Sequence, residues 1–67
     1  MALTWEDAED IAERLAAAHP DVDPLRLRFT DLRRWVLELA DFGDDPAAST
    51  EGKLEDIQMA WLEQRES

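Results

Sequence analysis

The sequence has no cysteine, only two glycines and a single histidine, His19, among its 67 residues. The absence of cysteine excludes disulfide bonds, thiolate zinc sites and cysteine nucleophiles. Two glycines cannot build a glycine-rich phosphate-binding loop, and one histidine gives little support for a Ser/His/Asp catalytic set. Because the common catalytic classes lack their residues, the sequence predicts a protein that is not an enzyme.

Long apolar runs are also missing. No stretch approaches the roughly 20 apolar residues of a membrane span. The N-terminal region is acidic, whereas a signal peptide needs a basic segment followed by an apolar one. We therefore expect a soluble, cytoplasmic protein that does not bind membranes.

Basic residues are few. Seven lysines and arginines stand against 17 acids, which gives a formal net charge of −10. This charge repels nucleic acid and anionic membranes and favours cations and basic protein surfaces. Four of the seven bases, Arg26, Arg28, Arg33 and Arg34, fall between residues 26 and 34, and the flanking regions are strongly acidic. The sequence thus predicts two different electrostatic faces.

The apolar residues are sufficient for one small domain, 1–67, expected to be a monomer. Hydrophobic residues make up 45% of the chain, although a domain this short buries only about 60% of its unfolded surface. Apolar residues recur at helical spacing in three segments. The predicted core consists of Trp5, Ile11, Leu15, Phe29, Leu32, Trp35, Val36, Leu39, Leu54, Ile57 and Trp61.

Three helices are expected. The first follows Thr4, which forms a capping-box-like pair with the acid three residues on, and it stops near Ala18 because a proline follows the next residue. The second is capped by Thr30 and ends at Gly43. The third opens at Ser49. This pattern predicts a mainly α fold, a small three-helix winged-helix-like domain of the helix-turn-helix type with minimal β structure; a plain three-helix bundle is the alternative.

The stretch DFGDDPAASTEGKLED, residues 41–56, holds six acids and one lysine. It fails as an EF-hand counted from its first residue, because Pro46 stands where glycine is needed and Gly52 where a bidentate glutamate is needed. Turn and capping chemistry explains Pro46 and Ser49 but not the clustered acids. A further stripe of acids occupies the first helix at i, i+3, i+4 and i+7: Glu6, Glu9, Asp10 and Glu13. Such stripes are solvated surfaces, or they bind a basic partner or hard cations.

The arginines allow a different interpretation. In a helix-turn-helix protein, Arg33 and Arg34 would lie near the start of the helix that enters a DNA groove. Phosphate contacts dominate such binding, however, and the rest of this chain would repel the duplex. We therefore predict no nucleic acid partner and expect Arg28 and Arg34 to pair with neighbouring carboxylates.

Along nearly its whole length the chain resembles the IscX family, small acidic proteins of bacterial iron–sulfur cluster assembly. The resemblance rests on Trp5, HPDVDP (19–24), RFTDL (28–32), Trp35, Leu39, DFGDDP (41–46), Ser49, Glu51, Leu54, Ile57 and Trp61. It implies a winged-helix-like fold without DNA binding, docking onto an IscS-like cysteine desulfurase, and weak iron binding on an acidic surface. The implied role is that of an iron donor or a desulfurase regulator, overlapping with frataxin. Ferredoxin and the scaffold proteins of the pathway are further implied partners.

The residues agree with this resemblance in one respect and depart from it in another. A chain without cysteine cannot hold a cluster through thiolates or accept a persulfide, so its role would be accessory. The departure is Gly43, which replaces the first of three acids that the family often shows before Pro46. This change weakens an iron site in the loop and leaves the docking hypothesis unaffected.

Two hypotheses of different classes follow. The first is an accessory or regulatory protein that docks on a cysteine desulfurase and binds iron weakly; the second is a generic acidic adaptor or a nucleic-acid-associated helix-turn-helix protein. The candidate iron ligands are surface carboxylates: Glu6, Asp10, Glu13, Asp44, Asp45, Glu51 and Glu55. The candidate partner-binding residues are Asp31, Asp44, Asp45, Glu51 and Glu55.

Overall fold

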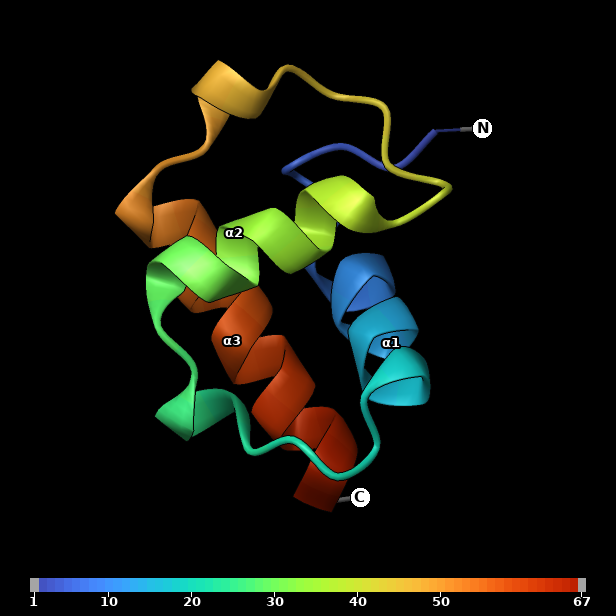
Figure 1. Ribbon diagram of the computed structural model, residues 1–67, viewed down its shortest axis with the longest axis vertical. Coiled ribbons are helices and arrows are strands. Elements are labelled where there is room, and N and C mark those ends of the chain that lie inside the picture. The colour runs from blue at the N-terminus through green and yellow to red at the C-terminus, as the bar shows by residue number, and fades with distance from the viewer. Residues whose placement is uncertain (1, 67) are drawn as a thin grey trace.

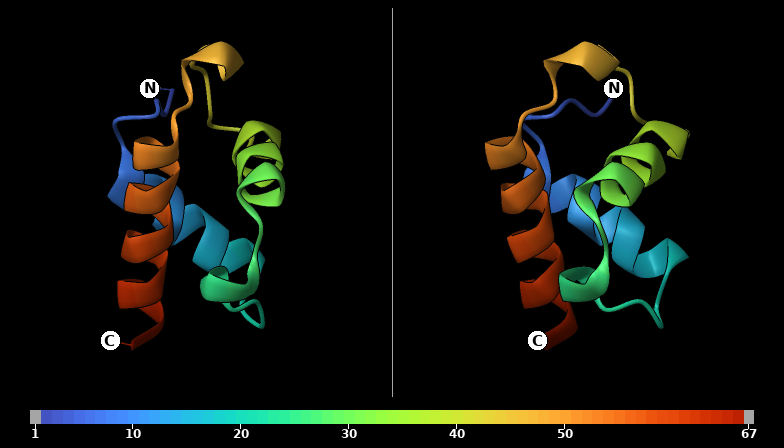
Figure 2. Two further views of the ribbon diagram at one scale, coloured as in Figure 1. Left: turned by 90° about the vertical axis from the view of Figure 1, so that its left-hand side faces the viewer. Right: turned by 60° about the vertical axis from the view of Figure 1, so that its left-hand side comes forward.

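The computed structural model describes residues 2–66, which form three α-helices and two short 3-10 turns. In chain order the elements are α1 (Ala8–Ala18), η1 (Pro24–Arg26), α2 (Phe29–Glu38), η2 (Pro46–Ala48) and α3 (Glu51–Glu66). Helices α1 and α3 lie side by side, and α2 covers one side of that pair (Figures 1 and 2). The prediction of a mainly α fold is confirmed. The winged-helix likeness stays a prediction, because residues 2–66 contain no β-strand from which a wing could be built. None of the helices described is long and apolar enough to cross a membrane.

The only β structure in the part of the chain that the structure describes is an isolated parallel bridge between Leu3 and Phe42. The Leu3 amide donates to the Asp41 carbonyl at 2.7 Å, and the Gly43 amide donates to the Leu3 carbonyl at 2.9 Å. The N-terminal segment therefore runs beside the loop that follows α2, as Figure 1 shows. This bridge places the start of the chain next to the acidic stretch.

The core contains most of the predicted residues. The eight predicted core residues that are buried are Trp5, Ile11, Leu15, Leu32, Val36, Leu54, Ile57 and Trp61. Leu3 and Ala12, which the predicted core did not include, are buried as well. Phe29, Trp35 and Leu39 are only partly buried and pack against this core from its margin. Among the three tryptophans, Trp5 and Trp61 are thus the central ones.

Trp35 lies at the edge of the core because it stacks on a polar ring. The His19 and Trp35 rings are nearly parallel, with centroids 4.0 Å apart and an interplanar angle of 12°. Trp61 lies behind this pair, tilted, at 6.4 Å from both rings. The single histidine therefore stacks on Trp35, and the two rings together pack against the buried Trp61.

Four predicted helix boundaries are wrong. Thr30 lies inside the first turn of α2, since the helix is entered at Arg28, whose carbonyl accepts from Leu32. The same helix ends at Glu38 rather than Gly43, because the backbone at Leu39 turns to an extended conformation. That turn lets both Leu39 and Phe42 pack on the core, which a longer helix with its 3.6-residue period would not allow.

The third error concerns Ser49, which precedes α3 but does not cap it. The adjacent Thr50 caps the helix: its hydroxyl accepts from the Lys53 amide at 3.2 Å and its carbonyl accepts from Leu54 at 3.0 Å. At the first helix, the Thr4 amide does donate to the Asp7 carboxylate, at 2.9 Å. That pair, however, forms a turn ahead of α1, so the predicted start after Thr4 is wrong: α1 begins at Ala8. Its end at Ala18 is as expected.

Candidate interaction surface

The loop between α2 and η2 is joined to the N-terminal segment through Trp5. One oxygen of Asp44 accepts from the Trp5 amide at 3.1 Å, and its other oxygen accepts from the Asp45 amide at 2.7 Å. The Trp5 indole donates to the Asp45 carbonyl at 2.8 Å, and the Asp45 carboxylate caps η2 through the Ala47 amide at 2.9 Å. Two predicted site acids therefore stabilise the fold as well as carrying charge at the surface.

These hydrogen bonds have an electrostatic consequence. The amides of Trp5 and Asp45, followed by the more distant charge of Lys53, lower the pKa of Asp44 below its ordinary value. Because the folded-state pKa is depressed, the Asp44 anion contributes stability that is fully present above the ordinary pKa. That contribution is lost as the pH falls through the lowered pKa.

Arg33 closes the same loop from α2. Its Nε donates to the Ser49 hydroxyl at 3.0 Å and its Nη2 donates to the Pro46 carbonyl at 2.9 Å. The neighbouring Arg34 pairs with Asp31 on its own helix at 3.6 Å. Both arginines that a helix-turn-helix protein would direct at DNA are thus engaged within the chain.

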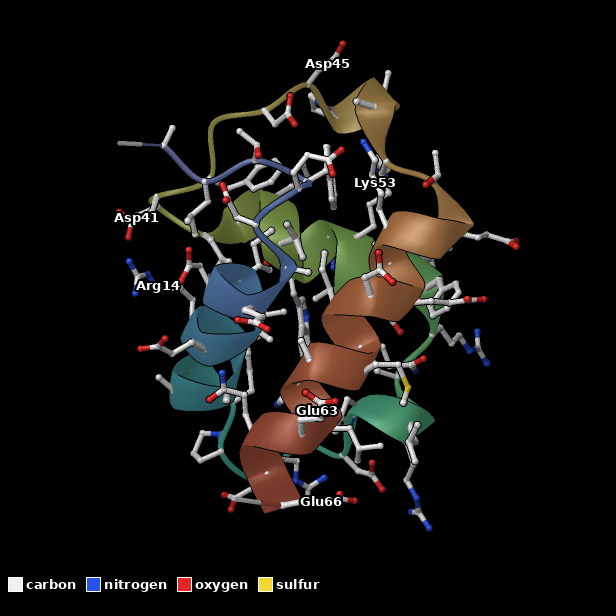
Figure 3. All side chains as sticks on the ribbon, turned by 180° about the vertical axis from the view of Figure 1, so that it is seen from behind. Arg14, Asp41, Asp45, Lys53, Glu63 and Glu66 are labelled. Carbon is white, nitrogen blue, oxygen red and sulfur yellow. The ribbon has the colours of Figure 1, made fainter. Side chains whose placement is uncertain are left out.

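Two open hollows on the α1 and α3 side are lined largely by carboxylates. One, of about 340 Å³, lies between the helices and is lined by Glu9, Ala60, Glu63 and Gln64. The other, of about 380 Å³, follows the start of α1 and is lined by Glu6, Asp7, Ala8, Glu9 and Asp10. Glu9 lines both, so the hollows adjoin. We call the four exposed acids around them, Glu6, Glu9, Asp10 and Glu63, the acidic face. Figure 3 labels Glu63 on α3.

One cation joins this face to the start of α3. Lys53 pairs with Glu6 at 2.8 Å, and its side chain is 31% exposed against 76% for the glutamate. Among the residues that the structure describes, no cation lines either hollow. Further along α1, Arg14 points toward Asp41 and pairs with it at 3.1 Å (Figure 3). The acidic face therefore carries an uncompensated negative charge.

The structure distributes the predicted site residues over several places. Glu6 and Asp10 belong to the acidic face, with Glu13 exposed one turn further along α1. Glu51 and Glu55 are exposed on the first turns of α3, on the element that also carries Lys53. The remaining predicted acids lie in the α2–η2 loop or on α2: Asp44, Asp45 and Asp31. Residues 2–66 contain no group of three or more histidines or carboxylates arranged to hold a metal ion.

Glu63 is not among the site residues predicted from the sequence. A signal was available, because Glu63 follows Asp56 by seven residues and positions seven apart share one side of a helix. What the spacing could not give is the pairing of Glu63 with Glu9, since their shared hollow exists only where α1 packs on α3.

Comparison with known proteins gives two findings. A sequence profile of the family described as "Iron-sulphur cluster assembly" matches residues 3–66. An uncharacterized protein of Pseudomonas aeruginosa is 52% identical over 66 residues, an alignment that covers 98% of this chain and 100% of that relative.

Proposed function

The chain belongs to the IscX family of iron–sulfur cluster assembly proteins, and we propose that it acts there as an accessory, regulatory protein without catalytic activity of its own. In this proposal it docks on a cysteine desulfurase through acidic surface residues. The family supports a role in the pathway, and the carboxylates support the mode of docking. Ferredoxin and scaffold proteins of the same pathway are the other partners proposed.

The observation that carries the proposal is the acidic face. Its two adjoining hollows are lined by five carboxylates and no base, and the nearest lysine is already paired with Glu6. Such a surface raises the association rate with a basic patch and weakens binding to acidic surfaces. Glu51 and Glu55, which flank this lysine at the start of α3, add further negative charge to the surface. A basic groove on the desulfurase is therefore the partner surface that this face fits.

The test is a calorimetric titration of a cysteine desulfurase with three double variants. Glu9→Lys with Glu63→Lys reverses the acidic face, and Glu51→Lys with Glu55→Lys reverses the start of α3. The control, Asp21→Lys with Glu38→Lys, reverses exposed acids elsewhere. Each reversal adds two charges, so every variant moves from −10 to −6. We expect about tenfold weaker binding for the first two variants, a difference of about 1.4 kcal/mol.

The control variant should bind within about threefold of the unaltered protein, and binding should weaken with salt for all forms. Equal weakening in the control would show that net charge alone governs the interaction and that no face is used. Unchanged affinity in both test variants would reject docking through these acids. Circular dichroism of each variant would confirm that the helices are retained.

We further propose that the surface carboxylates bind ferrous iron weakly. Hard cations take oxygen ligands, and acids spaced by three or four residues on a helix, such as Glu51 and Glu55 or Asp10 and Glu13, present two carboxylates to one ion. Water would complete the coordination. Because no group of three ligands converges within residues 2–66, the affinity should be in the low range of open carboxylate sites, about 10⁻⁴–10⁻³ M.

Paramagnetic broadening of backbone amides on adding ferrous iron tests this proposal. Broadening should affect amides near the candidate acids and spare the segment 26–34. In the Glu51→Gln, Glu55→Gln variant the broadening at the start of α3 should disappear while that along α1 persists. Broadening centred on His19, or none at millimolar iron, would contradict carboxylate binding.

A further inference from the structure

The seven bases of this acidic protein are not used alike. Five engage groups of their own chain: Arg14, Arg34, Lys53 and Arg65 pair with carboxylates, and Arg33 donates to Ser49 and Pro46. The other two, Arg26 and Arg28, are exposed and make no ion pair or side-chain hydrogen bond within residues 2–66. The prediction of a carboxylate partner is therefore wrong for Arg28. In a chain with 17 acids, two neighbouring arginines without such a partner require an explanation.

These two arginines flank Leu27, at the exit from η1. Leu27 and Arg28 have extended conformations, with ψ of 134° and 150°. Arg26 closes the 3-10 turn η1 and the chain bends at Leu27, so the two arginines follow one another around a turn rather than along a straight strand. Leu27 packs against the core, so Arg26 and Arg28 both project outward.

Exposed apolar side chains lie beside them. Leu25, in η1 next to Arg26, is 58% exposed, and Met59 is 51% exposed; these are the large hydrophobic residues left exposed within residues 2–66. The amide of Gln58, which precedes Met59, donates to the Pro24 carbonyl at 2.9 Å. Turn η1 therefore packs on α3, away from the loop that carries η2 (Figure 2). We call Leu25, Arg26, Arg28 and Met59 the η1 patch.

We propose that the η1 patch is a second docking surface, whose occupant is an extended acidic segment of another protein. Arginine binds carboxylates through two parallel hydrogen bonds. An extended acidic segment carries several carboxylates, so it can bring one to each of Arg26 and Arg28. Its intervening apolar side chains would cover Leu25 and Met59. A nucleic acid would not benefit from these apolar groups, and the net charge of −10 would repel it.

The chain then has two surfaces of opposite preference. The acidic face selects a basic partner, and the η1 patch selects an acidic one. Because the two surfaces involve different residues, each can be altered while the other is left intact. The η1 patch does not depend on docking to a desulfurase, so failure of either proposal leaves the other standing.

The test uses the full chain, labelled with ¹⁵N and with ¹³C at the methionine methyls, at low ionic strength. The probe is a short, end-blocked peptide in which glutamate alternates with leucine and serine; a control peptide has glutamine in place of glutamate. We expect the acidic peptide to shift the amides of residues 25–29 and the Met59 methyl. The glutamine peptide should cause shifts at least tenfold smaller at the same concentration.

Matched variants separate the patch from net charge. Arg26→Glu with Arg28→Glu should abolish the shifts, whereas Arg14→Glu with Arg34→Glu should preserve them. Each replacement removes two charges, so both variants move from −10 to −14. Shifts that persist in the first variant, or vanish equally in both, would overturn the proposal. If the first variant is unfolded by its ¹⁵N spectrum, Arg26→Gln with Arg28→Gln replaces it, with the same expected loss.

Two other occupants are outcomes of the same experiment. Concentration-dependent shifts at residues 25–29 without peptide, lost in the Arg26→Glu, Arg28→Glu variant, would identify a second copy of this chain as the occupant. Displacement of the acidic peptide by an equal concentration of duplex DNA would identify nucleic acid. Either result would overturn the assignment of an acidic protein segment.

Discussion

Replacing Trp61 with alanine is expected to unfold the protein at 25 °C. The side chain is 0% exposed and lies on α3, the helix that packs most extensively against α1. Removing a buried tryptophan costs about 3–5 kcal/mol. A core of this size supplies about 3–5 kcal/mol of net stability. The loss is therefore comparable with the whole free energy of unfolding.

Two matched variants sharpen this prediction. Trp35→Ala should leave a folded protein with reduced stability, because Trp35 lies at the margin of the core and its main ring contact is the stack on His19; such stacking is worth about 0.5–1.5 kcal/mol. Trp61→Phe should cost much less than Trp61→Ala. The Trp61 indole N–H is buried without a hydrogen-bond partner, so the phenyl ring loses volume and no bond.

Urea denaturation followed by circular dichroism measures all three variants. The expected order of stability is unaltered protein, then Trp35→Ala and Trp61→Phe, with Trp61→Ala last. A Trp61→Ala protein that unfolds cooperatively near the urea midpoint of the unaltered protein would show that the core tolerates the cavity. A Trp35→Ala protein less stable than the Trp61→Ala protein would show that Trp35, and not Trp61, is the central tryptophan of the core.

Gly43→Ala is expected to destabilise the protein by about 1–3 kcal/mol, the cost of overpacking. A Cβ at Gly43 would lie 2.5 Å from the Cβ of Ala2, inside any normal contact distance. To relieve this contact, Ala2 or Gly43 would have to shift. Such a shift would weaken the bridge between Leu3 and Phe42 and displace the buried Leu3 side chain, which is 8% exposed, together with the segment that leads to Trp5. Glycine is needed at position 43 because two backbone segments approach each other closely there. A left-handed backbone conformation is not the reason, since no glycine in residues 2–66 has a positive φ.

The second site of this pair provides the control. Ala2→Gly removes the methyl group that Gly43→Ala would meet, and alone it should change stability by less than about 0.5 kcal/mol because Ala2 is exposed. In that background Gly43→Ala should become neutral or stabilising by about 0.4–1 kcal/mol, since alanine restricts the unfolded chain. A double-mutant cycle measured by urea denaturation should therefore show that Ala2 and Gly43 are coupled. The change in the free energy of unfolding caused by Gly43→Ala should be negative with alanine at position 2 and zero or positive with glycine there. Equal effects of Gly43→Ala in both backgrounds would exclude the Ala2 contact as the cause.

Local patterns in the sequence determine much of this protein. The absence of cysteine, the net charge of −10 and the apolar spacing follow from the sequence alone. Periodicity over i, i+3 and i+4 identified three helices and eight of the buried residues, because a helix satisfies its backbone within four residues and buries one side. The motifs from HPDVDP to DFGDDP indicated the family to which the chain belongs.

Tertiary structure decided the features that need partners far apart in the sequence. Asp44 bonds to Trp5, which lies 39 residues away. Gly43, which is a normal helix terminator by local rules, is instead required where the chain passes Ala2. Ser49 accepts from Arg33, so capping falls to the next residue.

The same distinction applies to the surface. Glu9 and Glu63 are 54 residues apart and share a hollow only because α1 packs on α3. Arg26 and Arg28 remain without a carboxylate partner because the turn at η1 and its exit expose both of them where no acid of residues 2–66 reaches them. Composition fixed how much charge the protein carries, and folding fixed which charges are compensated, because ion pairing depends on distances of about 4 Å that only the packed chain sets.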